Sequence, residues 1–266
     1  MTRNTTVQAN ALLAALAALS LAAPVAAQIV REPELDDRLI NLPTQLVLSP
    51  GTLQVIFTHR FQEAASGAAG DLFGLDSGAD IGLGLGVGLG YGLEAELYRS
   101  SLFKEVETSL KWTALRQGAA FPLGVALRVG SEYRAASGIT DRWAGFGQLV
   151  IARRFGRAFD LFAVPIFVSD TPTLRNARNV GFGASLHLPR SWDVSAEGIP
   201  ANRDATNSAP AWAMGLTKRL RGHTFLLYFG NSRATTTDLI AGSDLPGGFK
   251  AGDLRLGFNL IRRFPE

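Results

Sequence analysis

The end of the chain carries a strict alternation of apolar side chains with polar or small ones. One face of a strand there would hold Leu254, Leu256, Phe258 and Leu260, and the other face Arg255, Gly257 and Asn259. A strand with one apolar and one polar face must lie between two different solvents. If these are lipid and a wet lumen, residues 252–264 form the closing strand of a membrane barrel, in which every backbone N–H and C=O pairs with a neighbouring strand.

The same period-two pattern recurs along the chain. Such runs lie at residues 52–61, 80–88, 93–99, 103–113, 123–133, 143–153, 159–168, 180–188, 192–198, 211–218, 224–231 and 253–264. The connections on the expected periplasmic side are brief and those on the outer side are mostly long, as in outer-membrane barrels. The pattern predicts an all-β fold, an antiparallel up-and-down transmembrane β-barrel of about twelve strands in residues 50–266.

One of these runs alternates with glycine. Single glycines separate Ile81, Leu83, Leu85 and Val87, a pattern that would weaken an isolated strand. In a barrel, glycines on the lumen side leave room for an inserted loop or a bulky neighbour. The alternation also differs from the G-x-G-x-x-G spacing of a dinucleotide-binding loop, so it excludes that cofactor motif.

The first 27 residues have the pattern of a secretory signal peptide. Arg3 precedes an apolar run over residues 9–23, and small residues follow it. The run is shorter than the roughly 20 residues that a membrane helix needs, so we expect cleavage after Ala27 rather than anchoring. Residues 28–49 are polar and are expected to form an extended lead-in in the periplasm. The barrel that follows would lie in the outer membrane.

Composition narrows the chemistry further. The chain has no cysteine, which excludes a disulfide scaffold and most zinc sites. A net charge of +3 gives no argument for nucleic acid as a partner. His187 shares a face with Ser185, but side chains two apart on a strand stand too far apart to bond easily, and no histidine pair has metal-ligand spacing. We therefore expect no enzyme activity, no metal and no cofactor.

Four glutamates share the lumen face of the hairpin expected over residues 93–113. They are Glu94, Glu96, Glu105 and Glu107. A turn centred between Ser100 and Ser101 would set Glu94 opposite Glu107 and Glu96 opposite Glu105. Like charges directly across a ladder are destabilising. The cluster would then need a cation, a basic partner or deep water.

Two interpretations of this acidic cluster stay open. A wide aqueous lumen, with Lys111 and Arg128 as counter-charges, would solvate it, since barrel lumens are ordinarily polar. Alternatively, the carboxylates form a cation-selective ring or a divalent site built from oxygens. Arg60, Arg255 and Arg263 share the inward face of the first and last strands. They are either the basic strip of a charge-screening pore or simple rim charges.

All four tryptophans fall near strand ends. Trp112 and Trp192 lie at expected inner ends, and Trp143 and Trp212 at outer ends, each on the apolar face of its strand. Tryptophan favours the headgroup level of a membrane, so this placement predicts the aromatic girdle of a barrel.

The first long loop, residues 62–79, is a candidate plug. It carries the apolar patch Phe73, Gly74, Leu75 and Asp76. Because long loops without secondary structure are often functional, the patch either folds back into the lumen or packs as an ordinary surface loop. The last loop, residues 232–252, has the composition of exposed turns.

Several sequence patches resemble a known family. They are the stretches 41–44, 59–61, 73–77 leading into 81–85, 115–117, 148–155, 222–232 and 252–264. These patches span nearly the whole mature chain, and it resembles the bacterial membrane-bound β-barrels grouped as domain of unknown function 5777. The resemblance implies an outer-membrane barrel and brings no established activity.

Together these features predict a narrow channel or small-solute transporter whose acidic and basic lumen groups set selectivity. Two alternatives stay open. The barrel could be plugged and non-conducting, a structural or assembly partner for a periplasmic protein that docks on residues 28–49, or it could be a membrane enzyme. Other expected partners are outer-membrane lipid and the barrel assembly machinery, which would contact the C-terminal strand.

Overall fold

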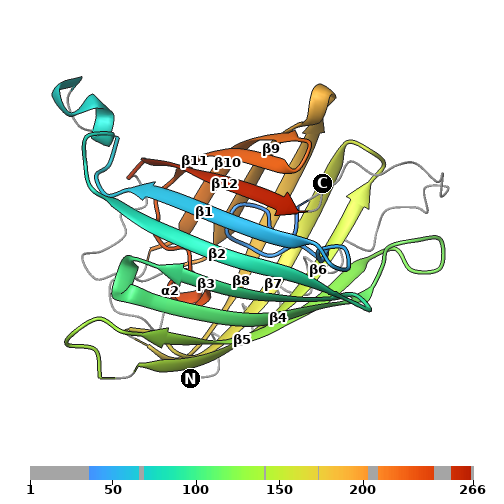
Figure 1. Ribbon diagram of the computed structural model, residues 1–266, viewed down its shortest axis with the longest axis horizontal. Coiled ribbons are helices and arrows are strands. Elements are labelled where there is room, and N and C mark those ends of the chain that lie inside the picture. The colour runs from blue at the N-terminus through green and yellow to red at the C-terminus, as the bar shows by residue number, and fades with distance from the viewer. Residues whose placement is uncertain are drawn as a thin grey trace.

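The first and last strands pair with each other and close the sheet. Leu53 of β1 lies opposite Phe264 of β12, and this ladder continues to Arg60 opposite Gly257. Each strand is also antiparallel to the next along the chain, so the strands form one closed ring (Figure 1). The expected antiparallel up-and-down barrel is confirmed. No helix in the described part of the chain is long and apolar enough to cross a membrane.

This computed structural model describes residues 36–264 apart from 66–68, 141, 173, 203–208 and 243–252. The strands are β1 (Leu53–Phe61), β2 (Ala79–Gly90), β3 (Leu93–Ser100), β4 (Glu105–Leu115), β5 (Gly124–Arg134), β6 (Trp143–Phe155), β7 (Phe159–Asp170), β8 (Arg175–Leu188), β9 (Trp192–Ile199), β10 (Ala211–Leu220), β11 (His223–Gly230) and β12 (Arg255–Phe264). Short helices are η1 (Ala69–Gly74), η2 (Leu102–Lys104), η3 (Pro189–Ser191) and α2 (Thr237–Gly242). The predicted signal peptide lies outside the described residues. We call the end of the barrel at which β1 begins the inner end.

The two faces of the strands match the period-two prediction. In β1, Gln54, Thr58 and Arg60 are buried inside the barrel, whereas Leu53 and Val55 are exposed on its outside. An apolar outer surface suits lipid, and a polar inner surface suits water or paired charges.

The glycine run of β2 is filled from inside by two neighbours. Tyr98 of β3 covers Gly82 and Gly84, and Leu48 lies 3.2 Å from the point where a Cβ would stand on Gly86. The glycines thus leave room both for a bulky neighbour, Tyr98, and for an inserted segment, which contributes Leu48, as expected.

Two segments from outside the sheet occupy the lumen. The first is residues 36–48, which we call the plug segment; Figure 1 shows it in blue within the ring of strands. The second is α2, whose residues are all buried. The expected periplasmic position is therefore wrong for residues 36–48, and the expectation of exposed turns is wrong for α2. Both segments lie inside because the barrel wall offers their apolar side chains a buried surface and their polar groups hydrogen-bond partners.

The first long loop does not enter the barrel. Leu72 and Phe73 are each 54% exposed and Leu75 is 43% exposed, and η1 stands beyond the outer end of the ring (Figure 1). Of the two alternatives for the patch that runs to Asp76, the surface loop is therefore the one that the structure shows, and the plug is not. The lumen that this loop was expected to fill is already occupied by other segments.

One arc of the inner wall is apolar rather than polar. Val150 of β6 and Val164 and Ile166 of β7 face inward and form a buried cluster with Leu239 and Ile240 of α2. The inner face of these strands packs on α2 and their outer face belongs to the exposed apolar surface, which explains why their sequences are apolar almost throughout. α2 is therefore seated by hydrophobic burial as well as by polar contacts.

Candidate functional site: the closed lumen

Ion pairs hold the inner part of the plug segment. Arg263 of β12 lies 2.6 Å from Asp36 and 3.1 Å from Asp37, and Lys111 of β4 donates to the backbone carbonyl of Asp37 at 2.9 Å. Burial alone would raise the pKa of Asp37, but the positive charges of Arg38, Lys111 and Arg263 outweigh it and hold that pKa well below its usual range. Asp37 therefore stays ionised, and its ion pairs persist, at mildly acidic pH.

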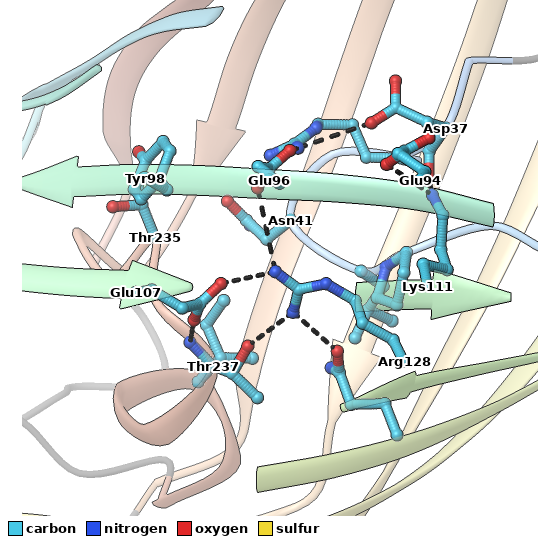
Figure 2. A pocket seen from close by; sticks show the side chains of 15 residues that line it. Asp37, Asn41, Glu94, Glu96, Tyr98, Glu107, Lys111, Arg128, Thr235 and Thr237 are labelled. Carbon is cyan, nitrogen blue, oxygen red and sulfur yellow. Dashed lines mark hydrogen bonds and ion pairs between the residues drawn. The ribbon is translucent and has the colours of Figure 1, made fainter. Parts of the chain in front are cut away.

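Arg38 links the plug segment to a glutamate of β3 on the barrel wall. Its guanidinium forms ion pairs with Asp37, at 3.4 Å, and with Glu96 of β3. Arg128 of β5 lies 3.7 Å from the same Glu96 and 2.5 Å from Glu107. Figure 2 shows Asp37 of the plug segment together with Glu96, Glu107 and Arg128 of the barrel wall.

Two wall glutamates bind the backbone of the plug segment. Glu197 of β9 accepts hydrogen bonds from the backbone N–H groups of Asn41, at 3.0 Å, and Leu42, at 3.1 Å. Glu94 of β3 accepts one from the N–H of Leu48 at 2.7 Å. A segment without regular secondary structure is thus anchored through its main chain on opposite sides of the lumen, and these wall carboxylates supply hydrogen-bond partners that a strand or helix would otherwise provide.

The apolar side chains of the plug segment fit against glycines of the wall. A Cβ on Gly181 would stand 2.8 Å from Leu42, and a Cβ on Gly183 would stand 2.5 Å from Leu39. Both glycines belong to β8, and a side chain at either position would force the facing leucine to shift. The wall is therefore shaped for this occupant.

All four predicted lumen glutamates are buried inside the barrel: Glu94, Glu96, Glu105 and Glu107. Their predicted register is wrong. Glu94 lies opposite Lys111, and Glu107 lies opposite Tyr98, because the connection between β3 and β4 includes η2 and is longer than a two-residue turn. The shift removes the like-charge pairs and gives Glu94 a counter-charge 3.3 Å away on Lys111. The expected counter-charges, Lys111 and Arg128, are confirmed.

Sequence reasoning missed two further carboxylates of this wall. Glu132 of β5 lies opposite Glu107, and Asp238 of α2 is fully buried beside Arg134, at 2.7 Å. The alternation of β5 could have placed Glu132 on the inward face with Arg128. No local signal marks Asp238, because its position depends on the burial of α2 inside the barrel.

The predicted basic residues face the lumen but do not form a free strip. Arg60 donates to the side chain of Asn259 at 2.8 Å and stacks 4.0 Å above the ring of Tyr228. Arg263 binds the plug segment at the inner end, whereas Arg255 lies near the outer end, 3.4 Å from Asp253. The three residues are spread along the barrel axis, and each has its own partners.

The four predicted girdle tryptophans lie on the outer surface of the barrel. Exposed fractions of 46%, 68% and 37% put Trp112, Trp143 and Trp192 on the outer surface, and Trp212 is half-buried on the same surface. Their role as a membrane girdle stays a prediction.

His187 is held by two aspartates. Its Nδ1 lies 2.6 Å from Asp193 and its Nε2 lies 2.5 Å from Asp160. Ser185 instead accepts a hydrogen bond from Ser195 at 3.0 Å. A nucleophile–base pair of Ser185 and His187 is therefore not formed in this structure.

Little space is left where the plug segment approaches α2. A cavity of about 20 Å³ lies there, lined by residues that include Arg38, Glu96, Tyr98 and Thr237. Such a volume holds about one or two water molecules. Among the described residues, the plug segment and α2 thus leave little space at this level of the lumen.

Several solved structures resemble this chain. The NanC porin is 8% identical, with a TM-score of 0.49 over 79% of this chain and 98% of that one. Outer membrane phospholipase A from Escherichia coli is 13% identical, with a TM-score of 0.48 over 81% and 91%. An outer membrane channel from Pseudomonas putida F1 is 13% identical, with a TM-score of 0.45 over 83% and 98%. With TM-scores below 0.5, these likenesses say nothing about the activity of this chain.

A search of curated proteins finds no match. A family model described as a membrane bound beta barrel domain matches residues 35–264, a range that spans every described strand. The resemblance seen in the sequence is thereby confirmed. The chain belongs to the family of membrane-bound β-barrel domains called DUF5777.

Proposed function

We propose that this barrel is a gated outer-membrane channel for ions or small polar solutes, closed at rest by the plug segment. The observation that carries the proposal is the way the plug segment is held. It has no strand or helix of its own, and charged wall residues that suit an aqueous pore grip it through ion pairs and hydrogen bonds.

The charges of the wall support a lumen that opens to water. Replacing a buried ion pair by well-packed apolar residues is often neutral or stabilising. Stability alone therefore gives little reason for a permanently filled lumen to keep Glu94, Glu96, Lys111 and Arg128, all of which are buried or nearly so. Charges at these positions would line an aqueous pore when water and solute replace the plug segment.

A permanently plugged barrel that serves as a structural or assembly partner is the second candidate. It is favoured by α2, because Leu239 and Ile240 are packed in an apolar cluster that water would disrupt. The two functions differ in one measurable property, since only the channel conducts. In either case the apolar outer face and the outward tryptophans support a location in outer-membrane lipid.

The test is the conductance of the folded full-length chain in planar bilayers, compared with that of Arg263→Gln. Losing one partner of a buried ion pair is costly, but the Arg263 side chain is 23% exposed and solvent screens part of the effect. We expect the closed state to lose about 1–2 kcal/mol, which raises the open fraction about 5- to 30-fold.

Arg157→Gln is the matched control. It removes the same charge at the same end of the barrel, from an exposed residue in the turn between β6 and β7, and should leave the open fraction unchanged. A full-length barrel that never opens, with or without Arg263, would argue for the plugged structural role instead.

A further inference from the structure

Two groups of three carboxylates lie inside the barrel. One consists of Asp37, Glu94 and Glu96, and the other of Glu105, Glu132 and Asp238. Within each group, one carboxylate oxygen of each residue lies within 4.8 Å of one oxygen of each of the other two. The groups differ in their counter-charges, and that difference indicates a ligand.

Basic side chains balance the first group. Arg38 is paired with Asp37 and Glu96, Lys111 lies 3.3 Å from Glu94, and Arg128 also approaches Glu96. Figure 2 shows the labelled members of this group with dashed lines to neighbouring nitrogen atoms. No cation is needed to neutralise it.

The second group lacks this balance. Arg134 is its basic partner, 2.7 Å from Asp238 and 3.4 Å from Glu105. The adjacent Glu107 is already paired with Arg128. Among the described residues, the three carboxylates of the second group therefore share one guanidinium, which Asp170 also approaches at 3.7 Å. Buried negative charge left without a partner is strongly destabilising.

Two oxygens of this group have no hydrogen-bond partner. They are Oε1 of Glu105 and Oε2 of Glu132, and both residues are 0% exposed. The opposite oxygens are satisfied: Oε2 of Glu105 accepts from Thr236 at 2.7 Å, and Oε1 of Glu132 accepts from the N–H of Asp238 at 2.9 Å. Oε1 of Glu105 has only an ion-pair contact, 3.4 Å from Nε of Arg134. Fully buried acceptors without a hydrogen bond indicate a missing cation or donor, because such groups are nearly always satisfied in folded proteins.

We propose that Glu105, Glu132 and Asp238 bind one hard divalent cation, Ca²⁺ in preference to Mg²⁺. Ca²⁺ binds carboxylate oxygens at about 2.3–2.6 Å, so oxygens that share one ion lie at most about 5 Å apart, as these do. An ion of charge +2 also offsets the negative charge of the three carboxylates that Arg134 does not neutralise. Mg²⁺ usually keeps several waters, which a fully buried site has little room to supply.

The ion would join α2 to the barrel wall. Asp238 belongs to α2, whereas Glu105 stands on β4 and Glu132 on β5. Ca²⁺ therefore stabilises the closed lumen by holding α2 in place. This latching role rests on the proposed channel function, but binding of the ion does not.

The test is titration calorimetry of the full mature chain, folded in detergent and stripped with EDTA. We expect one Ca²⁺ to bind per chain and Mg²⁺ to bind more weakly. Glu132→Gln, and separately Asp238→Asn in α2, should each weaken Ca²⁺ binding at least about tenfold. Loss of a residue that only orients a metal ligand already costs about that much, so loss of a ligand should cost no less. Circular dichroism checks that each variant keeps its strands.

Glu96→Gln is the matched control, because it removes a carboxylate from the balanced group and should leave Ca²⁺ affinity unchanged. An absence of Ca²⁺ binding at millimolar concentration, or equal binding by wild type and Glu132→Gln, would overturn the site. In bilayers, Ca²⁺ should lower the open fraction of wild type but not that of Glu132→Gln. Stoichiometric binding without any change in conductance would overturn the latch and leave the site standing.

Discussion

Deleting residues 36–48 is expected to turn a barrel that is mostly closed in planar bilayers into one that conducts continuously. The deletion removes the guanidinium of Arg38 from the acidic wall and the contacts of Asp36 and Asp37 with Arg263. It also frees the carboxylate of Glu197, which binds two N–H groups of the segment. Charges that lose buried partners strongly favour rehydration, so water should enter the inner half of the lumen.

The barrel itself should survive this deletion. β1 begins at Leu53, so no deleted residue belongs to a strand, and strand content measured by circular dichroism should not change. A synthetic peptide with the sequence of residues 36–48 should block the deleted channel when it is added from the inner side. The same peptide with Arg38 replaced by Gln should block it more weakly. A folded deletion variant that remains shut would show that α2 closes the barrel without the plug segment.

The strands were predictable because each carries its own two-faced pattern. In β1 the order of inward and outward residues follows from the sequence alone, and the pairing of β1 with β12 follows from the need to leave no free edge in lipid. β8 is longer than predicted. It begins at Arg175 rather than near Val180 because Ala177 and Asn179 face inward against the filled lumen, and the outward Arg178 hides the pattern.

The filling of the lumen was only half predictable. Glycines of β2 indicated that something bulky must lie inside, but the occupants are set by contacts between residues far apart in the sequence. Arg38 and Glu96 carry no mutual signal, and neither do Leu42 and Gly181. The register of the β3–β4 hairpin failed for a related reason, because η2 adds residues to the turn and moves every glutamate to a new partner.

Adding a side chain to the barrel wall where the plug segment packs should open the channel without deleting any residue. Gly183 and Gly181 leave the space that Leu39 and Leu42 occupy, at 2.5 and 2.8 Å from the positions of the missing Cβ atoms. In Gly183→Val the new side chain and Leu39 compete for one volume. Overpacking of this kind costs about 1–3 kcal/mol, so the open fraction should rise about 5- to 150-fold in bilayers.

The chain offers a matched control and a compensating change for this experiment. Gly147 of β6 has nothing within 4 Å of its Cβ position, so Gly147→Val adds the same side chain to a strand without touching the plug segment and should leave the channel closed. Leu39→Ala empties the contested volume, so the double variant Leu39→Ala with Gly183→Val should recover most of the closure. Equal opening by Gly183→Val and Gly147→Val would show that added bulk disturbs the barrel in general. Recovery in the double variant separates the two causes, because only displacement of the plug segment can be relieved by trimming the residue that it places against the wall.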